Sequence, residues 1–241
     1  MPSILNVDTW EALAAQIKGA VEANQKIYRG VTDFDGHKLI PKIGRPGARK
    51  DPANGSGRPY SEEDEKRLLE VFRRTARPFL SYEPKSDFEW LAVAQHHGSP
   101  TRLLDWTESP LVAAYFAMEK AGTSGKPAVY VLDPPPKTSD SDDPFSIPTV
   151  RSYHPPHISP RIQAQSSVFT IHPRPELEYD PPGLIVWLFP GGQPCWEIKR
   201  VIDRCGFNRA SLFPGLDGLA EHVGWCYKWG GSEGRVKLRQ Y

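Results

Sequence analysis

The chain is poor in cysteine and has no long apolar run, and these two absences narrow its class. Three cysteines, Cys195, Cys205 and Cys226, occur among the 241 residues. Because their number is odd and their spacing is unlike that of metal sites, we expect small buried thiols, a reduced compartment and no bound metal. No segment approaches the roughly 20 apolar residues that span a bilayer, and the N-terminus lacks the pattern of a secretory signal. These features predict a cytoplasmic protein without membrane contact.

An excess of one charge is also absent. Lys and Arg number 30 and Asp and Glu number 29, so no strong overall field favours nucleic acid or an anionic membrane. A local basic group consists of Arg45, Arg49, Lys50 and Arg58. Because these side chains lie among glycines and prolines, we interpret residues 44–60 as a solvated loop.

Helix start signals, apolar periodicity and proline positions predict the architecture. Thr9, Ser61 and the pair Ser109-Pro110 each precede a helical pattern, as N-capping residues do. The predicted helices cover residues 10–24, 62–76, 87–97, 110–122, 197–205 and 216–227. The predicted strands cover residues 26–30, 101–107, 128–132, 168–171 and 183–188. Many of the 25 prolines fall between about 133 and 183, which indicates extended connections there.

Helices and short strands are mixed without regular alternation, which predicts an α+β fold. We expect a single domain over residues 25–225, with a helix from residues 1–24 packed on it and a C-terminal tail over 226–241. A chain of this length can bury a sizeable core.

The stretch QHHGSPTRLLDWTESPLVAAYFA, residues 95–117, concentrates the chemically active side chains. His96 and His97 precede a turn, and Arg102 and Asp105 bracket a short apolar run that leads into a capped helix. Such side chains at a turn–strand–helix junction indicate a site. The structural alternative is that Arg102 and Asp105 form a buried ion pair and that the histidines fill the core or cap a helix.

The same stretch, together with Tyr28-Arg29-Gly30, resembles the FRG domain, a family named for a Phe/Tyr-Arg-Gly motif near its start. Two later blocks resemble this family as well. They are RIQAQ at 161–165 with FTIH at 169–172, and SLFPGLDGLA at 211–220. The four blocks follow the order of the family and cover nearly the whole chain.

The FRG pattern is in turn similar to that of ADP-ribosyltransferases. These enzymes place an arginine on an early strand, a Ser/Thr-containing strand that runs into an Ala- and Phe-rich helix, and a glutamate on a late strand. Residues 28–30 and 106–117 match the first two elements. The resemblance implies an ADP-ribosyltransferase-like core with a split, mostly antiparallel sheet flanked by helices. It also implies NAD, or a related nucleotide, as the substrate and a macromolecule as the target.

The resemblance assigns roles to individual residues. Arg29 suits phosphate or ribose contacts because guanidinium is always charged and bidentate, and Gly30 lets a ligand approach the backbone. Thr107 would support the ribose, while Trp106 or Tyr115 would line the nicotinamide pocket. The candidate catalytic residues are Arg29, His97, Arg102, Asp105 and Gln165. The candidate NAD-binding residues are Tyr28, Arg29, Gly30, Trp106, Thr107, Tyr115 and Gln163.

The chain departs from the transferase pattern at the expected late strand. Gln163 and Gln165 stand where those enzymes carry glutamate. An amide supplies no negative charge to stabilise an oxocarbenium ion. The carboxylates that could replace the glutamate are Asp105, Glu108, Glu176 and Glu178.

Three functions stay open on the sequence. The first is an ADP-ribosyltransferase-like enzyme, acting as a toxin or an anti-phage effector. The second is a non-catalytic nucleotide- or protein-binding module that uses the same pocket. The third is a hydrolase in which His96 or His97 pairs with Asp105, although this set lacks a nucleophile. A carboxylate within reach of Arg29 and Thr107 would favour the first.

Two structural expectations accompany these hypotheses. We expect one concave site to contain four residues that are far apart in the sequence, Arg29, His97, Arg102 and Asp105. We expect the block 211–220 to be core rather than chemistry, with Leu212, Phe213, Leu216 and Leu219 directed inward.

Overall fold

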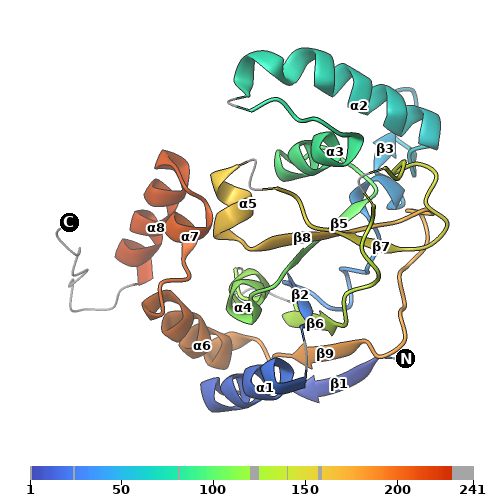
Figure 1. Cartoon of the computed structure of the whole chain (residues 1–241). Helices are drawn as coiled ribbons and strands as arrows, with labels where there is room; N and C mark the ends of the chain where they lie inside the picture. The colour runs from blue at the N-terminus through green and yellow to red at the C-terminus, as the bar shows by residue number, and fades with distance from the viewer. Residues whose placement is uncertain are drawn as a thin grey trace.

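A seven-stranded sheet forms the centre of the molecule (Figure 1). The structure, a computed structural model, describes residues 2–23, 25–80, 82–119, 125–139, 141–156 and 159–229. The strand order is β1-β9-β6-β2-β5-β8-β7. The strands are β1 (Ser3–Asn6), β2 (Ile27–Val31), β5 (Leu103–Thr107), β6 (Ala128–Leu132), β7 (Arg151–Tyr153), β8 (Ser167–Ile171) and β9 (Ile185–Leu188). β1 and β9 run parallel and the other neighbours antiparallel. The expected α+β fold with a mostly antiparallel sheet and flanking helices is confirmed.

The sheet is nearly interrupted between β2 and β5. β2 pairs with β6 along its whole length, and β5 does so with β8. Between β2 and β5, by contrast, the described ladder consists of one pair, Tyr28 with Thr107. The sheet therefore has a first half, β1-β9-β6-β2, and a second half, β5-β8-β7. A gap in the ladder leaves backbone groups free to face a ligand.

Different helices cover the two halves (Figure 1). Helices α1 (Trp10–Ala23), α4 (Pro110–Ala117) and α6 (Gly192–Arg204) share a core cluster with the first half, which includes Tyr28, Val129 and Trp187. Helices α2 (Glu62–Ala76) and α3 (Asp87–His96) share another cluster with the second half, which includes Leu103 and Phe169. The short helices α5 (Pro160–Ala164) and α7 (Arg209–Leu212) lie beside both halves, together with α8 (Leu216–Trp229). The two halves are thus packed by separate sets of helices.

Three predicted helix starts are confirmed by their caps, whereas the helix predicted from residue 197 begins earlier, at Gly192, without a side-chain cap. The Thr9 hydroxyl accepts a hydrogen bond at the start of α1. Ser61 and Asp64 form a capping box at α2, and Ser109 caps α4. Each cap satisfies a backbone N–H that the helix leaves without a partner. Helix α4 ends at Ala117 with Met118 as its C-cap, so the predicted extension toward Gly122 is wrong; Gly122 itself lies outside the described residues.

Several short elements differ from the prediction. The stretch expected as a loop, 44–60, holds the two-residue strands β3 (Arg49–Lys50) and β4 (Gly57–Arg58), which pair with each other. Its first residue, Gly44, ends a 3-10 turn, η1 (Lys42–Gly44), and a second such turn, η2 (Arg77–Phe79), follows α2. β1, β7, α5 and α7 were not predicted either. Each has five residues or fewer, and none contains a continuous apolar run like that of β6.

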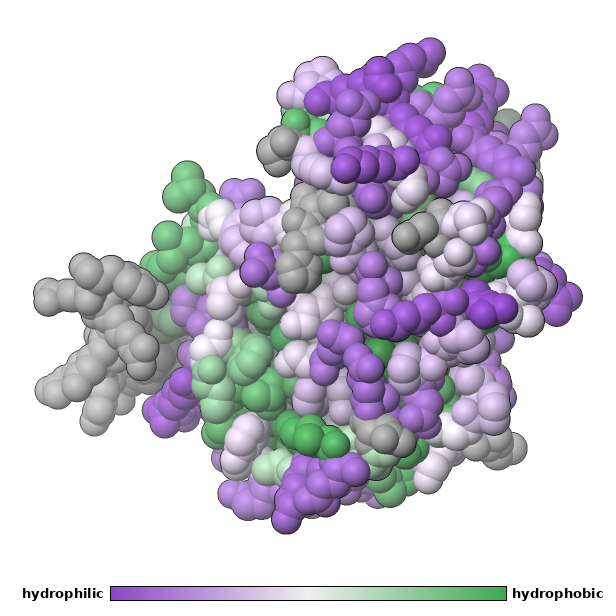
Figure 2. Space-filling model, in the orientation of Figure 1, coloured by the Kyte–Doolittle hydropathy of each residue, from purple (hydrophilic) through white to green (hydrophobic). Residues whose placement is uncertain are grey.

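The expectation that the 211–220 block is core is wrong for part of it. Leu212 is buried and Phe213 is half-buried, but Leu216 is 83% exposed and Leu219 is also exposed. Figure 2 shows apolar surface on the side of the molecule where α7 and α8 lie. The helical spacing was correct, but this face of α8 has no element of the described chain packed over it. Within the block, the α8 residue that packs closely against Phe213 is Gly218, where a Cβ would lie 2.0 Å from the Phe213 carbonyl oxygen.

The cysteines do not share one environment. Cys195 is buried and Cys226 is half-buried, whereas Cys205 is exposed at the end of α6. The expectation of buried thiols is therefore wrong for Cys205. No helix in the described part of the chain combines the length and the apolar character needed to cross a bilayer. The division at residues 24 and 225 stays a prediction.

Candidate functional site

A cleft of about 640 Å³ lies at the break in the sheet. Its walls come from β2 and the residue after it (28–32), β5 (105–107) and the end of α3 (95–98). Further lining residues are His37, Arg45, Phe116, Glu119, Arg161, Gln165 and Ser167. This volume is in the range of pockets for small ligands and cofactors. Three segments that lie far apart in the sequence thus meet where β2 and β5 separate.

Arg29 spans the break and contacts Asp105. Its Nη1 atom donates to the Asp105 carbonyl oxygen at 2.6 Å and lies 3.5 Å from the carboxylate Oδ2. Gln95 Nε2 also donates to this Oδ2 at 2.9 Å, and Gln95 is itself held by the Thr101 hydroxyl. The Asp105 side chain remains 53% exposed. The carboxylate is therefore held by one hydrogen bond and one ion pair in a cleft that a ligand can enter.

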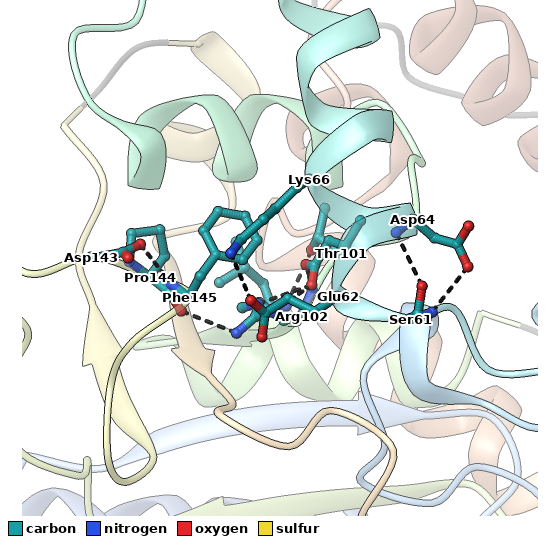
Figure 3. A network of polar contacts seen from close by, with 11 residues as sticks. Ser61, Glu62, Asp64, Lys66, Thr101, Arg102, Asp143, Pro144 and Phe145 are labelled. Carbon is teal, nitrogen blue, oxygen red and sulfur yellow. Dashed lines mark hydrogen bonds and ion pairs between the residues drawn. The ribbon is translucent and has the colours of Figure 1, made fainter.

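Arg102 lies outside the cleft, which corrects the expectation of a four-residue site. It is 1% exposed, and its backbone N–H, Nε and Nη2 all donate to the Glu65 carboxylate at 2.8–3.0 Å. Nη1 donates to the Pro144 carbonyl oxygen, and the guanidinium lies over the Phe145 ring (Figure 3). Burial raises the pKa of Glu65, against the effect of these hydrogen bonds. Arg102 therefore ties α2 and the 143–146 segment to the start of β5.

The two histidines differ in environment. His97 ends α3 and is exposed at the cleft. His96 also lines the cleft, but its Nε2 is buried without a hydrogen-bond partner in the described chain. Burial, followed by the charge of Arg161, lowers the pKa of His96 to about 4. Neither imidazole is hydrogen-bonded to Asp105 among the described residues, so the base–orienter pair of the hydrolase hypothesis is not formed.

Thr107 and Trp106 line the cleft but already have partners. Thr107 Oγ1 donates to the Gln165 carbonyl oxygen at 2.7 Å, and Trp106 Nε1 donates to the Thr170 hydroxyl at 2.9 Å. Tyr28 also lines the cleft and pairs with Thr107 across the break. The pair of Tyr28 and Thr107 therefore joins the two halves of the sheet, while the Trp106 hydrogen bond lies within the second half.

Gln163, Gln165 and Tyr115 differ most from their predicted places. The two glutamines do not lie on a late strand, because Gln163 is in α5 and Gln165 is its C-cap. Gln165 lines the cleft, but its amide donates to the Leu212 carbonyl oxygen, and Gln163 is not part of the cleft wall. Tyr115 lines a smaller cavity of about 150 Å³ between α4, α6, α7 and α8. Helix α5 begins with Ser159-Pro160, just as α4 begins with Ser109-Pro110. This start signal could have identified α5 from the sequence.

Packing against α4 explains why position 30 is a glycine. A Cβ at this position would lie 1.9 Å from the Ala113 carbonyl oxygen and 2.6 Å from the Ala117 nitrogen. Helix α4 therefore rests directly on the backbone of β2, so no larger residue fits without movement. The glycine of this motif brings the helix, rather than a ligand, close to the strand.

Of the four carboxylates considered as replacements, only Asp105 belongs to the cleft wall. Asp105 lines the cleft, whereas Glu108 faces away to Gln25 and His154. Glu176 and Glu178 are not part of the cleft wall either. Glu119, which the sequence did not indicate, lines the cleft and pairs with Arg209 at 2.8 Å. No group of three or more His, Cys, Asp or Glu in the described chain is placed to hold a metal ion.

Arg45 and Arg161 are cleft residues that the sequence interpretation missed. Arg45 belonged to the basic group assigned to a solvated loop, yet it is half-buried in the cleft wall. Arg49 and Arg58 of the same group do lie outside the cleft, where both pair with Asp64. Arg161 stood in a quoted motif, but a sequence motif alone does not show which side chains face a cavity.

Comparison with known proteins identifies one relationship. Residues 24–126 match the FRG domain family. The matched region holds β2, α3, β5 and α4, and with them Arg29, His96, Asp105 and Glu119. No curated protein and no solved structure matches the chain.

Proposed function

Since residues 24–126 form an FRG domain, we propose that its cleft binds NAD and that the protein is an ADP-ribosyltransferase-like enzyme. The acceptor would be a macromolecule, as for a toxin or an anti-phage effector. The observation that carries the proposal is the carboxylate of Asp105, fixed beside Arg29 in the cleft at the sheet break.

The chemistry requires a negative charge close to the ribose. The bond between the anomeric carbon and nicotinamide breaks, and its electron pair leaves with nicotinamide, which becomes neutral. The acceptor oxygen or nitrogen bonds to the anomeric carbon and releases its proton. Positive charge develops on the sugar in the transition state, as in glycoside hydrolysis. Asp105 supplies a fixed, half-exposed negative charge for this purpose.

The test is release of nicotinamide from NAD by the purified protein, with and without cell extract. Asp105→Asn keeps the side-chain size and the backbone acceptor for Arg29 but removes the charge, so we expect release to fall about a hundredfold or more. Glu108→Gln is the matched control, because Glu108 lies three residues further along the chain and outside the cleft. This control should release nicotinamide at the wild-type rate.

A second function is favoured by a separate observation. β8, the strand that follows α5, has the sequence SVFTI and carries no carboxylate. A non-catalytic nucleotide- or protein-binding module needs none. If wild type binds NAD but releases no nicotinamide under any condition tested, the binding module replaces the enzyme. If wild type neither binds nor cleaves NAD at millimolar concentration, the NAD proposal fails.

A further inference from the structure

Two guanidinium groups in the cleft wall have no carboxylate partner among the described residues. They belong to Arg45 and Arg161, which approach the cleft from different parts of the fold. Burying a charge that is not paired is unfavourable. Two such groups in one cavity therefore indicate that the counter-charge comes from a ligand.

Arg161 is held rigidly with its charge uncompensated. Its Nη1 donates to the His96 carbonyl oxygen at 3.1 Å, and its guanidinium lies 4.3 Å from the centre of the Phe213 ring. On the same ring, at 3.5 Å, lies the guanidinium of Arg209. Burial and the charge of Arg209 lower the pKa of Arg161. Its position is thus fixed by a ring and a carbonyl group, neither of which neutralises it.

Arg45, from the segment that follows η1, is the second guanidinium of the cleft wall without a carboxylate partner among the described residues. Its Nε donates to the Ile40 carbonyl oxygen at 3.1 Å. A carbonyl group carries no net charge, so this hydrogen bond does not neutralise the guanidinium. Burial, followed by the charge of Arg29, lowers the pKa of Arg45, and Asp105 opposes this effect. Asp105 also acts on Arg161 in the same sense. Both guanidiniums therefore lie within electrostatic range of Asp105.

The other charged side chains of the cleft wall, histidines apart, have ion-pair partners. Arg29 pairs with Asp105. Glu119 pairs with Arg209, which stands behind the cleft wall and also pairs with Glu221 at 2.7 Å. Arg45 and Arg161 then contribute two positive charges that form no ion pair with a described side chain. Asp105 acts on both of them from a longer distance, and Glu119 acts on Arg161. The best complement is a ligand with two adjacent negative charges, and guanidinium groups bind phosphate oxygens in a bidentate manner.

We propose that Arg45 and Arg161 form the diphosphate-binding part of the cleft, which makes it selective for nucleoside diphosphates over uncharged nucleosides. This inference rests on the proposed function because it uses the same cleft, but it does not require that NAD is cleaved there. It assigns the phosphate contact to Arg45 and Arg161 instead of Arg29. Arg29 is left to orient Asp105.

The test uses calorimetric titration with ADP, inorganic pyrophosphate and adenosine. Wild type should bind ADP and pyrophosphate, with affinity that falls as salt is raised. Arg161→Gln and Arg45→Gln should each weaken ADP binding about ten- to a hundredfold. Adenosine binding should be the same in all variants. Arg58→Gln is the control, since it removes one charge from the same basic loop but outside the cleft.

Each outcome bears on the inference. ADP binding that is equal in wild type and both cleft variants would overturn the inference. Equal weakening by Arg58→Gln, or a wild type that binds neither ADP nor pyrophosphate, would overturn it as well.

Arg161→Lys replaces Arg161→Gln if the glutamine variant does not fold. The lysine keeps the charge and should bind ADP with an affinity between those of wild type and Arg45→Gln. Full wild-type affinity of this variant would contradict the bidentate contact. ADP binding through these arginines without NAD cleavage would refute only the enzyme. NAD cleavage whose KM does not change in Arg161→Gln would refute only the diphosphate contact.

Discussion

Two arginine–carboxylate pairs adjoin β5, and they differ in almost every physical respect. Arg102 and Glu65 are 1% and 2% exposed and form several hydrogen bonds with each other. Arg29 and Asp105 meet across a break in the sheet, with the carboxylate more than half exposed. The first pair is saturated by the protein and the second is open to solvent. Burial and hydrogen-bond completeness, not residue type, therefore separate a structural pair from a candidate binding pair.

The largest expected effect comes from breaking the buried pair. Arg102→Met leaves the Glu65 carboxylate buried without its partner, which should reduce the free energy of unfolding by about 3–5 kcal/mol. The measurement is chemical denaturation followed by circular dichroism.

The double variant Glu65→Leu with Arg102→Met is the control. It removes both charges and should recover part of the loss, because replacing both members of a buried pair costs less than removing one. A loss below about 1 kcal/mol in Arg102→Met would show that this pair does not hold α2 to β5.

An intermediate effect is expected at the floor of the cleft. Gly30→Ala puts a Cβ into the backbone of α4, and overpacking of this kind costs roughly 1–3 kcal/mol or more. Thermal unfolding measures it. Gly19→Ala is the matched control, since the added methyl group meets nothing within 4 Å on α1. That variant should be neutral or more stable by up to about 1 kcal/mol. Equal melting temperatures for the two variants would contradict the close approach of α4 to β2.

The smallest expected effect is a dependence of stability on pH that arises in the cleft. His96 has a pKa of about 4 in the folded protein, against an ordinary value of 6.5. The unfolded chain therefore binds this proton first, so the stability that His96 contributes is present above about pH 6.5 and is lost as the pH falls toward 4.

The comparison uses denaturation at pH 7 and pH 4.5. His96→Asn should lose less stability between these two values than wild type, whereas exposed His97→Asn should behave as wild type does. The buried His172, whose pKa burial lowers to about 3, titrates in the same direction but is present in every variant, so it cancels in the difference. An unchanged pH dependence in His96→Asn would show that its burial is incomplete in solution.

The elements that the sequence predicted are those with local signals. Caps at Thr9, Ser61 and Ser109 set helix starts, and continuous apolar runs set β6 and β8. Helix α5 begins with the same kind of signal, Ser159-Pro160, but its five residues are too few for a helical period to support it. Gln165 was therefore expected on a strand although it ends this helix.

The candidate site was predicted in part. The motifs that contain Arg29, His97 and Asp105 do meet in one cleft. Arg102 was wrongly included, because its partner Glu65 lies 37 positions earlier in a helix start, where an acidic residue is expected to face solvent. Spacing in the sequence cannot show that α2 crosses the start of β5 and buries that carboxylate.

The sequence by itself therefore determined the fold class, the main helices and strands, and the short segments that carry the cleft chemistry. Those features depend on interactions within a few residues, such as caps and apolar periodicity. The tertiary structure alone decided which arginine meets which carboxylate, and that Arg45 and Arg161 pair with no carboxylate of the described residues. Ion pairing and burial depend on distances between segments that only the packed chain brings together, so no local pattern can specify them.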